Sequence, residues 1–202
     1  MAKAVASAFE TVGWKVAAPG KDELDVTCKE AIRTFFESRP VDLLVCAAGL
    51  ALDAPLIRYA SEAWETVMTV NFQGAADCAA AVLPGMVGRR TGHIVFVSSY
   101  SALHPPVGQV AYSTAKAALL GLTFAMAREH GSNGIRVNAI LPGFLDTRMT
   151  EQVSPARKEE VLSAHVLDHF NTPEAVGRFV RFLEENLPFT SGQIFQLDSR
   201  IS

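Results

Sequence analysis

Tyr112 and Lys116 stand four positions apart and are well suited to acid–base chemistry. Residues at this spacing lie on one face of a helix, so the phenol and the ammonium can share one small space. A nearby ammonium favours the phenolate and lowers the pKa of the phenol. Such a tyrosine can give a proton to a carbonyl oxygen or take one from an alcohol. The pair alone is equally compatible with an ordinary amphipathic helix.

A second hydroxyl, that of Ser99, lies just beyond a predicted strand over residues 93–98. Ligands of open parallel sheets bind beyond the carboxyl ends of the strands, where a hydroxyl can polarise the same carbonyl. The neighbouring Ser98 is an alternative for this role, and both serines could merely cap the strand exit. Asn71 follows a helix that carries Trp64, and by itself a mid-helix asparagine is usually solvated or bonded to its own helix.

The elements that must position these residues alternate between apolar strands and helices, as in a parallel sheet covered on both faces. Strands are predicted at residues 14–18, 43–48, 93–98, 137–141 and 193–197, and helices at 3–11, 28–38, 72–86, 111–129 and 173–186. Ser61 is the predicted N-cap of a further helix. The segment 43–48 is apolar throughout, which predicts a strand buried on both faces. We find no repeat or linker and predict one domain over residues 1–202.

Composition limits the function classes. The chain has 202 residues, 49% of them hydrophobic, and a net charge of -3 without a long run of one sign. This argues for a globular protein with a three-layer core and against a nucleic-acid partner. We see no leader and no apolar stretch of the roughly 20 residues that span a bilayer, so we predict no membrane partner.

The metal-binding residue types suggest no site. The three cysteines, Cys28, Cys46 and Cys78, have no CxxC spacing and are interpreted as core residues in a reducing compartment, which predicts a cytoplasmic protein. His165 and His169 are four residues apart but lack a third ligand, so we interpret them as surface or lid residues and predict no metal.

Together these motifs resemble a known family. Asn71, the end of the strand at Ser98–Ser99, Tyr112-x-x-x-Lys116 and the segment 142–147 (PGFLDT) occur in the order and spacing of short-chain dehydrogenases/reductases. The resemblance runs from Ala2 to Asp198 and is greatest to the branch that contains 3-oxoacyl-carrier-protein reductases. It implies a Rossmann-like doubly wound parallel sheet in three α/β/α layers.

The resemblance also implies an activity: hydride transfer between NAD(P)(H) and a carbonyl or secondary alcohol, such as a 3-oxoacyl thioester. Tyr112 would be the acid/base and Ser99 would orient the substrate oxygen. Lys116 would lower the pKa of the tyrosine and hold the nicotinamide ribose, and Asn71 would hold a water that relays protons to Lys116. His104 could contact a polar substrate group or face solvent, and residues 149–170 are a predicted lid.

For the cofactor, the resemblance places the backbone of Leu145 and the hydroxyl of Thr147 on the nicotinamide carboxamide, Gly49 beside the adenosine and Asp25–Val26 on the adenine. Lys21 could meet a 2′-phosphate or simply be solvated, so NADP is slightly favoured over NAD. The full set assigned to the cofactor is Asp25, Val26, Gly49, Tyr112, Lys116, Pro142, Gly143, Leu145 and Thr147. The small-residue helices 72–86 and 111–129 match those that pair across a two-fold axis in the family, which implies a homodimer or homotetramer.

The sequence departs from the family in four places. The first strand and the turn T-G-x-x-x-G-x-G would lie before Met1, and only a short segment joins Ala18 to Val26, where a helix and a strand are usual. Cys46–Ala47 replaces two asparagines, and Asp198-Ser199-Arg200 replaces an aspartate and two glycines. Without the phosphate turn, either the working protein has more N-terminal sequence or the chain is a non-catalytic binding or assembly subunit. A nucleotide-sugar epimerase would need a larger C-terminal region.

Overall fold

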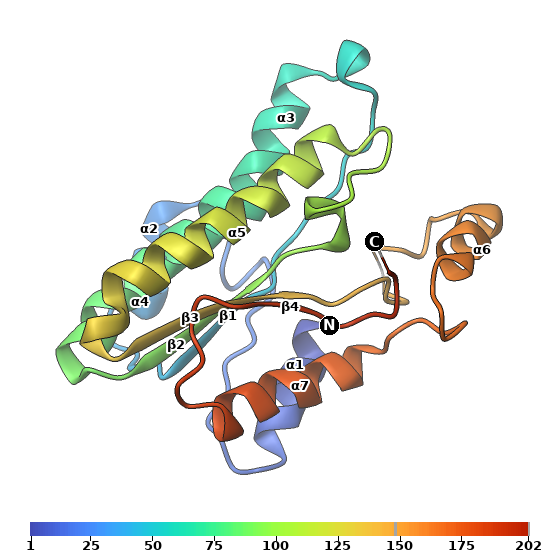
Figure 1. The fold of residues 1–202 in the computed structure, drawn as a ribbon. Coiled ribbons are helices and arrows are strands. Elements are labelled where there is room, and N and C mark those ends of the chain that lie inside the picture. Colours follow the sequence, from blue (N-terminus) through green and yellow to red (C-terminus); the bar gives the residue numbers. More distant parts are fainter. Residues whose placement is uncertain (148, 202) are drawn as a thin grey trace. The chain divides into compact units, whose positions relative to one another are not determined.

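A computed structural model of the chain describes residues 1–147 and 149–201 (Figure 1). The chain forms two compact units. The larger comprises Pro19–Ile140 and Phe189–Phe195, and the smaller is built from Met1–Ala18, Leu141–Pro188 and the C-terminal segment from Gln196. One domain over residues 1–202 therefore stays a prediction.

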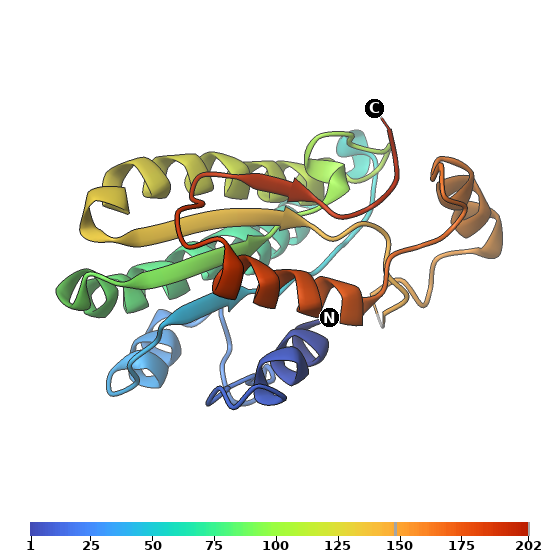
Figure 2. The same ribbon diagram turned by 60° about the horizontal axis from the view of Figure 1, so that its bottom comes forward.

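A four-stranded sheet organises the larger unit (Figure 2). Its strands lie in the order β1 (Leu43–Cys46), β2 (Gly92–Val97), β3 (Ile135–Leu141) and β4 (Ile194–Gln196). The pairs β1–β2 and β2–β3 are parallel, with Val45 opposite Val95 and Val95 opposite Asn138. All six residues of β2 are buried. Parallel strands alternating with helices confirm the predicted Rossmann-like α/β class.

The helices of the larger unit are α2 (Lys29–Phe36), α3 (Ser61–Met68), α4 (Gly74–Arg89) and α5 (Val110–His130). A π-helical turn over Thr69–Gln73 joins α3 to α4, so one helical run extends from Ser61 to Arg89 (Figure 1). The predicted helix at 72–86 lies within this run. The prediction of Ser61 as N-cap is wrong, because Ala60 holds that position and no side chain caps the helix.

Strand β1 lies at an edge of the sheet. Within the described residues it pairs with β2 only, and its four residues are half-buried. The prediction of a strand buried on both faces is therefore wrong. Its apolar composition suits an interior strand, but burial depends on neighbours that the local sequence does not specify.

The predicted strand at 14–18 is also wrong. Among residues 1–147 and 149–201, no strand pairs with this segment. Its first residue is instead held locally, because the Trp14 N–H donates to the Phe9 carbonyl at 3.2 Å and the two rings meet edge to face at 5.1 Å. A β-rich segment becomes a strand only where a partner accepts its ladder hydrogen bonds.

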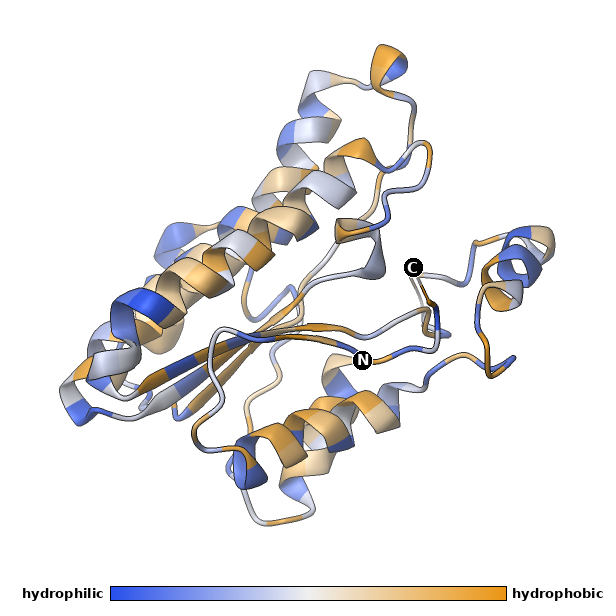
Figure 3. Cartoon of the chain, in the orientation of Figure 1, coloured by the Kyte–Doolittle hydropathy of each residue, from blue (hydrophilic) through white to orange (hydrophobic). Residues whose placement is uncertain are grey.

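The smaller unit contains α1 (Ala2–Glu10), α6 (Pro155–Ser163) and α7 (Pro173–Asn186). Helices α1 and α7 lie side by side (Figures 1 and 2), and Gly177 permits their approach, since a Cβ there would come within 2.7 Å of the Ala4 carbonyl oxygen. Helix α6 has no buried residue and is mostly hydrophilic (Figure 3). It lies within the predicted lid and is not part of the core.

Helix α5 and the turn after it, Val110–Asn133, are long and apolar enough to cross a membrane by length and composition alone. The prediction that no such stretch exists is therefore wrong. The helix buries Ser113, Lys116 and Thr123 within the larger unit. Because Lys116 and Thr123 are buried and donate hydrogen bonds to carbonyls inside the protein, we interpret α5 as a core helix.

Candidate active site

Ser99 and Tyr112 meet beyond the carboxyl end of β2. Ser99 precedes a short 3-10 helix, Tyr100–Ala102, and its Oγ accepts the Ser101 N–H at 3.2 Å. Tyr112 lies in the first turn of α5, and its phenol is hydrogen-bonded by the Ser99 hydroxyl. The two hydroxyls are thus close enough to share one substrate oxygen, which is the geometry that carbonyl polarisation requires.

The neighbouring Ser98 has a different environment. It is buried, and its hydroxyl donates to the Lys116 carbonyl at 2.8 Å, which fastens the end of β2 to α5. The sequence left Ser98 and Ser99 as alternatives. Successive residues of an extended segment face opposite sides, so only one of them can face Tyr112, and in the structure that residue is Ser99.

Lys116 is 3% exposed, and its ammonium donates to the Val97 carbonyl at 2.9 Å. The Nζ atom also lies 5.7 Å from the centroid of the Tyr112 ring, as the spacing of four predicts. Burial lowers the pKa of Lys116 from 10.5 to about 8. An ammonium has three N–H groups, and within the described part of the chain only one finds a partner, so donors remain for a polar ligand.

Tyr112 departs from its predicted electrostatics. Burial raises the pKa of its phenol, Asp53 raises it further, and only the bond from Ser99 lowers it. The expectation that Lys116 lowers this pKa is not met in the structure, because the ammonium is directed to the Val97 carbonyl. A raised pKa keeps the phenol protonated at neutral pH, and a protonated phenol is a proton donor.

Asn71 is fully buried in the π-helical turn between α3 and α4. Its amide donates to the carbonyls of Leu50 at 2.7 Å and Val67 at 2.9 Å, and its Oδ1 accepts the Leu50 N–H at 3.2 Å. The side chain therefore fixes the loop after β1, next to Gly49. π-turns inside α-helices are frequent at functional sites, and nothing in the residue pattern signals this one.

A second polar chain, missed by sequence reasoning, borders the Ser99–Tyr112 pair. The Ser101 hydroxyl donates to Gln109 Oε1 at 3.0 Å, and Gln109 Nε2 donates to Asp53 Oδ2 at 2.8 Å. The chain ties the loop after β1 to the segment before α5. The sequence gives no sign of it, because Asp53 and Gln109 are 56 positions apart and neither belongs to a recognisable motif.

The segment expected at the adenine packs against the start of α4. Asp25 accepts hydrogen bonds from the backbone and hydroxyl of Thr27, which lower the pKa of its carboxyl. A Cβ at Gly74 would come within 2.7 Å of the Val26 carbonyl oxygen, so only glycine permits this contact. Cys46, where the family has asparagine, is close to the Ala75 carbonyl at 3.7 Å, and burial raises the pKa of its thiol.

The segment expected at the nicotinamide belongs to the smaller unit. Pro142 follows β3, Gly143 has a φ of 84°, and Leu145 is buried. The Thr150 hydroxyl donates to the Leu145 carbonyl at 2.5 Å and accepts the Thr147 N–H at 2.9 Å, so the turn is closed by its own bonds. The predicted residues of this turn therefore lie together, in a backbone conformation that favours glycine.

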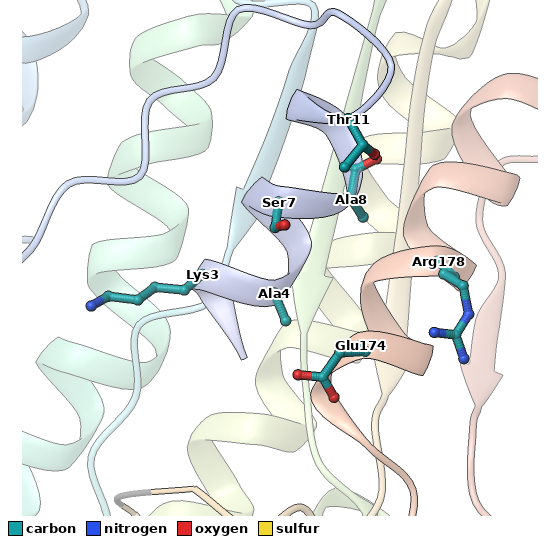
Figure 4. Close-up of a pocket in the computed structure, with 7 residues that line it drawn as sticks. All are labelled: Lys3, Ala4, Ser7, Ala8, Thr11, Glu174 and Arg178. Atoms are coloured by element: carbon teal, nitrogen blue, oxygen red, sulfur yellow. The ribbon is translucent and has the colours of Figure 1, made fainter.

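One groove of the smaller unit contains none of the predicted site residues. It runs between α1 and α7 and is lined by Lys3, Ala4, Ser7, Ala8, Thr11, Glu174 and Arg178 (Figure 4). Its side chains are those of an open helix–helix surface, with Lys3 directed outward (Figure 4).

The described residues contain no group of three potential metal ligands. His169 is exposed, but His165 is buried, so of the two interpretations, surface or lid residue, the first is wrong for His165 and the second stays a prediction. His104 stacks on the Tyr100 ring at 4.4 Å.

Comparison with known proteins gives a consistent result. A sequence model of the family described as short chain dehydrogenase matches residues 2–158. The 3-oxoacyl-acyl-carrier-protein reductase of Thermotoga maritima is 35% identical over 189 residues, which cover 89% of this chain and 77% of that protein. The reductase of the same name from Chlamydia muridarum is 34% identical, covering 86% and 71%, and that from Synechocystis is 33% identical, covering 98% and 78%.

Proposed function

The chain belongs to the short-chain dehydrogenase/reductase family of enzymes, and we propose that it reduces the ketone of a 3-oxoacyl thioester with a nicotinamide cofactor. The observation that carries the proposal is the hydrogen bond between Ser99 and Tyr112, with Lys116 behind them on the same helix. The names of the similar reductases support the choice of substrate.

In this proposal Tyr112 donates a proton to the ketone oxygen while Ser99 donates a hydrogen bond to the same oxygen. The raised pKa of Tyr112 suits reduction, since a proton donor must be protonated when substrate binds. Lys116 restores the phenol proton, with Asn71 positioning a water for the relay. Two groups aimed at the developing alkoxide supply the electrostatic stabilisation that such a transition state needs.

Family membership implies a nicotinamide cofactor, which supplies the hydride when bound. The free N–H donors of Lys116 suit the hydroxyls of its ribose. Pro142, Gly143, Leu145 and Thr147 would hold the carboxamide, and Asp25, Val26 and Gly49 the adenosine end. Lys21 could meet a 2′-phosphate, so NADP is slightly favoured over NAD.

The substitution Tyr112→Phe tests the chemistry. We expect it to abolish reduction of a short 3-oxoacyl thioester, followed by nicotinamide absorbance, while leaving cofactor affinity largely intact. Tyr59→Phe is the matched control, because its phenol donates to the Leu52 carbonyl and does not contact Ser99. A Tyr112→Phe variant that keeps most of its activity would refute the assignment.

A fluorescence titration with NADPH and NADH addresses the alternative of a non-catalytic binding or assembly subunit. That alternative arises because the family's phosphate turn is not among the 202 residues of this sequence. Saturable binding with NADPH tighter than NADH supports the proposal, and no saturable binding supports the alternative.

The proposal extends to assembly and location. We expect a cytoplasmic homodimer or homotetramer that takes a small-molecule carbonyl or alcohol substrate. Light scattering after size-exclusion chromatography measures the mass in solution, and the mass of one chain would contradict this assembly.

A further inference from the structure

A buried carboxylate in the smaller unit has no role in the proposed chemistry. Asp198 follows β4, and its side chain is fully buried. One carboxylate oxygen accepts Gln196 Nε2 at 2.8 Å, and the other accepts Arg200 Nε at 2.6 Å, with a second bond from the Arg200 guanidinium. A carboxylate so fully bonded has one preferred orientation, because charge-assisted bonds of this kind are short and directional.

His165, the residue after the turn that ends α6, faces the same carboxylate. Its side chain is fully buried, with Nε2 3.7 Å from Asp198 Oδ2 and Nδ1 2.8 Å from the Val161 carbonyl. A carbonyl can only accept, so Nδ1 carries a proton. Nε2 has no hydrogen-bond partner in the described residues and is directed at the carboxylate, so the imidazole covers Asp198 from solvent.

Backbone contacts also join the segment after α6 to the C-terminal tail. His165 and Arg200 form an antiparallel bridge, the Val166 N–H donates to the Ser199 carbonyl at 3.2 Å, and the Leu167 N–H donates to the Ser199 hydroxyl at 3.4 Å. Asp198-Ser199-Arg200, which replaces the family's aspartate and two glycines, therefore makes contacts that two glycines could not make through side chains. Its side chains tie the tail to the segment after α6.

Asp198 also supports the turn after β3. A Cβ on Gly143 would lie 2.6 Å from the Asp198 Cβ, so the aspartate packs directly on the glycine backbone. Asn171 adds a second link, since its amide donates to the Pro142 carbonyl at 3.2 Å and to the Leu197 carbonyl at 2.8 Å. The turn and the segment after α6 thus rest on the same short stretch of tail.

We propose that Asp198 is a positioning residue that holds the 142–147 turn in its binding conformation, with Arg200 and Gln196 fixing its carboxylate. The inference rests on the proposed function, in which this turn holds the nicotinamide carboxamide. It gives α6 and the cofactor-binding turn a common anchor. Loosening the carboxylate should therefore weaken cofactor binding more than the chemical step, because the reacting hydroxyls of Ser99 and Tyr112 belong to the larger unit and, within the described residues, make no contact with Asp198 that would position them.

The test compares Asp198→Asn, which keeps the shape beside Gly143 but weakens the bonds from Arg200, with Asp168→Asn as a matched control. Asp168 is exposed and has a φ of 50°, a conformation that asparagine adopts readily. We expect Asp198→Asn to raise the KM for the cofactor about tenfold while kcat and the KM for the ketone change less than about threefold. The control should match the wild type. Arg200→Gln should have a similar but smaller effect.

Amide hydrogen exchange gives a readout that does not depend on activity. In Asp198→Asn we expect faster exchange both at Val166–Leu167 and in residues 142–147, with α7 unchanged. Faster exchange at Val166–Leu167 alone, or an unchanged cofactor KM, would overturn the positioning role. If the wild type neither binds nor turns over a nicotinamide cofactor, the proposed function fails, and the exchange pattern alone decides whether Asp198 holds the turn.

Discussion

Ser98 and Ser99 are adjacent at the end of β2, so the same substitution, serine to alanine, can be made in two different environments. Ser98→Ala removes a buried bond of 2.8 Å to the Lys116 carbonyl, which still accepts an N–H within α5. The loss should cost about 1 kcal/mol of unfolding free energy, or roughly 2–4 °C in Tm for a chain of this length. Because Ser98 does not face Tyr112, we expect kcat to fall less than about fivefold.

Ser99→Ala should give the opposite pattern. It removes the hydroxyl that bonds Tyr112 and, in the proposed function, the substrate oxygen. Loss of one such donor typically lowers kcat about 100- to 1,000-fold, which corresponds to about 3–4 kcal/mol of transition-state stabilisation. Ser99 also caps the 3-10 helix through the Ser101 N–H, so a stability loss of up to about 1 kcal/mol is expected.

Urea unfolding and steady-state reduction of a short 3-oxoacyl thioester would be measured on both variants and the wild type. Similar stabilities with a large difference in kcat support the assignment. If Ser98→Ala loses as much activity as Ser99→Ala, or if Ser99→Ala keeps more than a tenth of wild-type kcat, the reasoning from strand alternation is wrong.

Two further predictions concern stability. Gly74→Ala should destabilise the chain by about 1–3 kcal/mol in urea unfolding and weaken cofactor binding, because its methyl group would meet the Val26 carbonyl. The control Gly88→Ala should be neutral or slightly stabilising, because nothing lies within 4 Å of a Cβ at that position. Equal effects of the two substitutions would contradict the packing argument. Lys116→Met should stabilise the chain by up to about 3 kcal/mol below pH 8, since the folded pKa of about 8 lies below the ordinary 10.5 and burial penalises the charged form there. Between about pH 8 and 10.5 the unfolded chain holds the Lys116 proton more tightly than the folded chain, so the wild type should gain stability relative to this variant as pH rises across that range. A constant difference in the free energy of urea unfolding across that range would exclude the lowered pKa.

How far the sequence predicted the fold depended on whether the signal was local. Helix α7 begins and ends where predicted, because Thr172 caps the Ala175 N–H and Pro173 occupies the first position, both recognisable in the sequence. The segment 14–18 and strand β1 were misjudged for the opposite reason. Pairing and burial depend on neighbouring strands, and the apolar composition of a segment does not say which neighbours it has.

The site shows the same division. The spacing of four placed Lys116 beside the Tyr112 ring, since that relation is fixed by one helix. The direction of the Tyr112 pKa could not be predicted, because it depends on burial, on Asp53 from the loop after β1 and on the carbonyl to which Lys116 turns. The buried junction of Asp198 with His165 was missed because it joins residues 33 positions apart, and the pair has no spacing signal of its own.

The strongest physical argument for a functional site is the cost of what is buried around the end of β2. A stable sheet does not need an ammonium whose pKa is lowered by burial, yet Lys116 lies there with Val97 as its partner. Asn71 lies in the π-turn between two α-helices, and both ends of its amide are hydrogen-bonded to the backbone of Leu50. Burying an ammonium or an amide side chain carries a desolvation cost that an apolar side chain does not have. Because Lys116 lies beside the Tyr112 ring and the π-turn packs on α5, function explains the position of both features better than folding does.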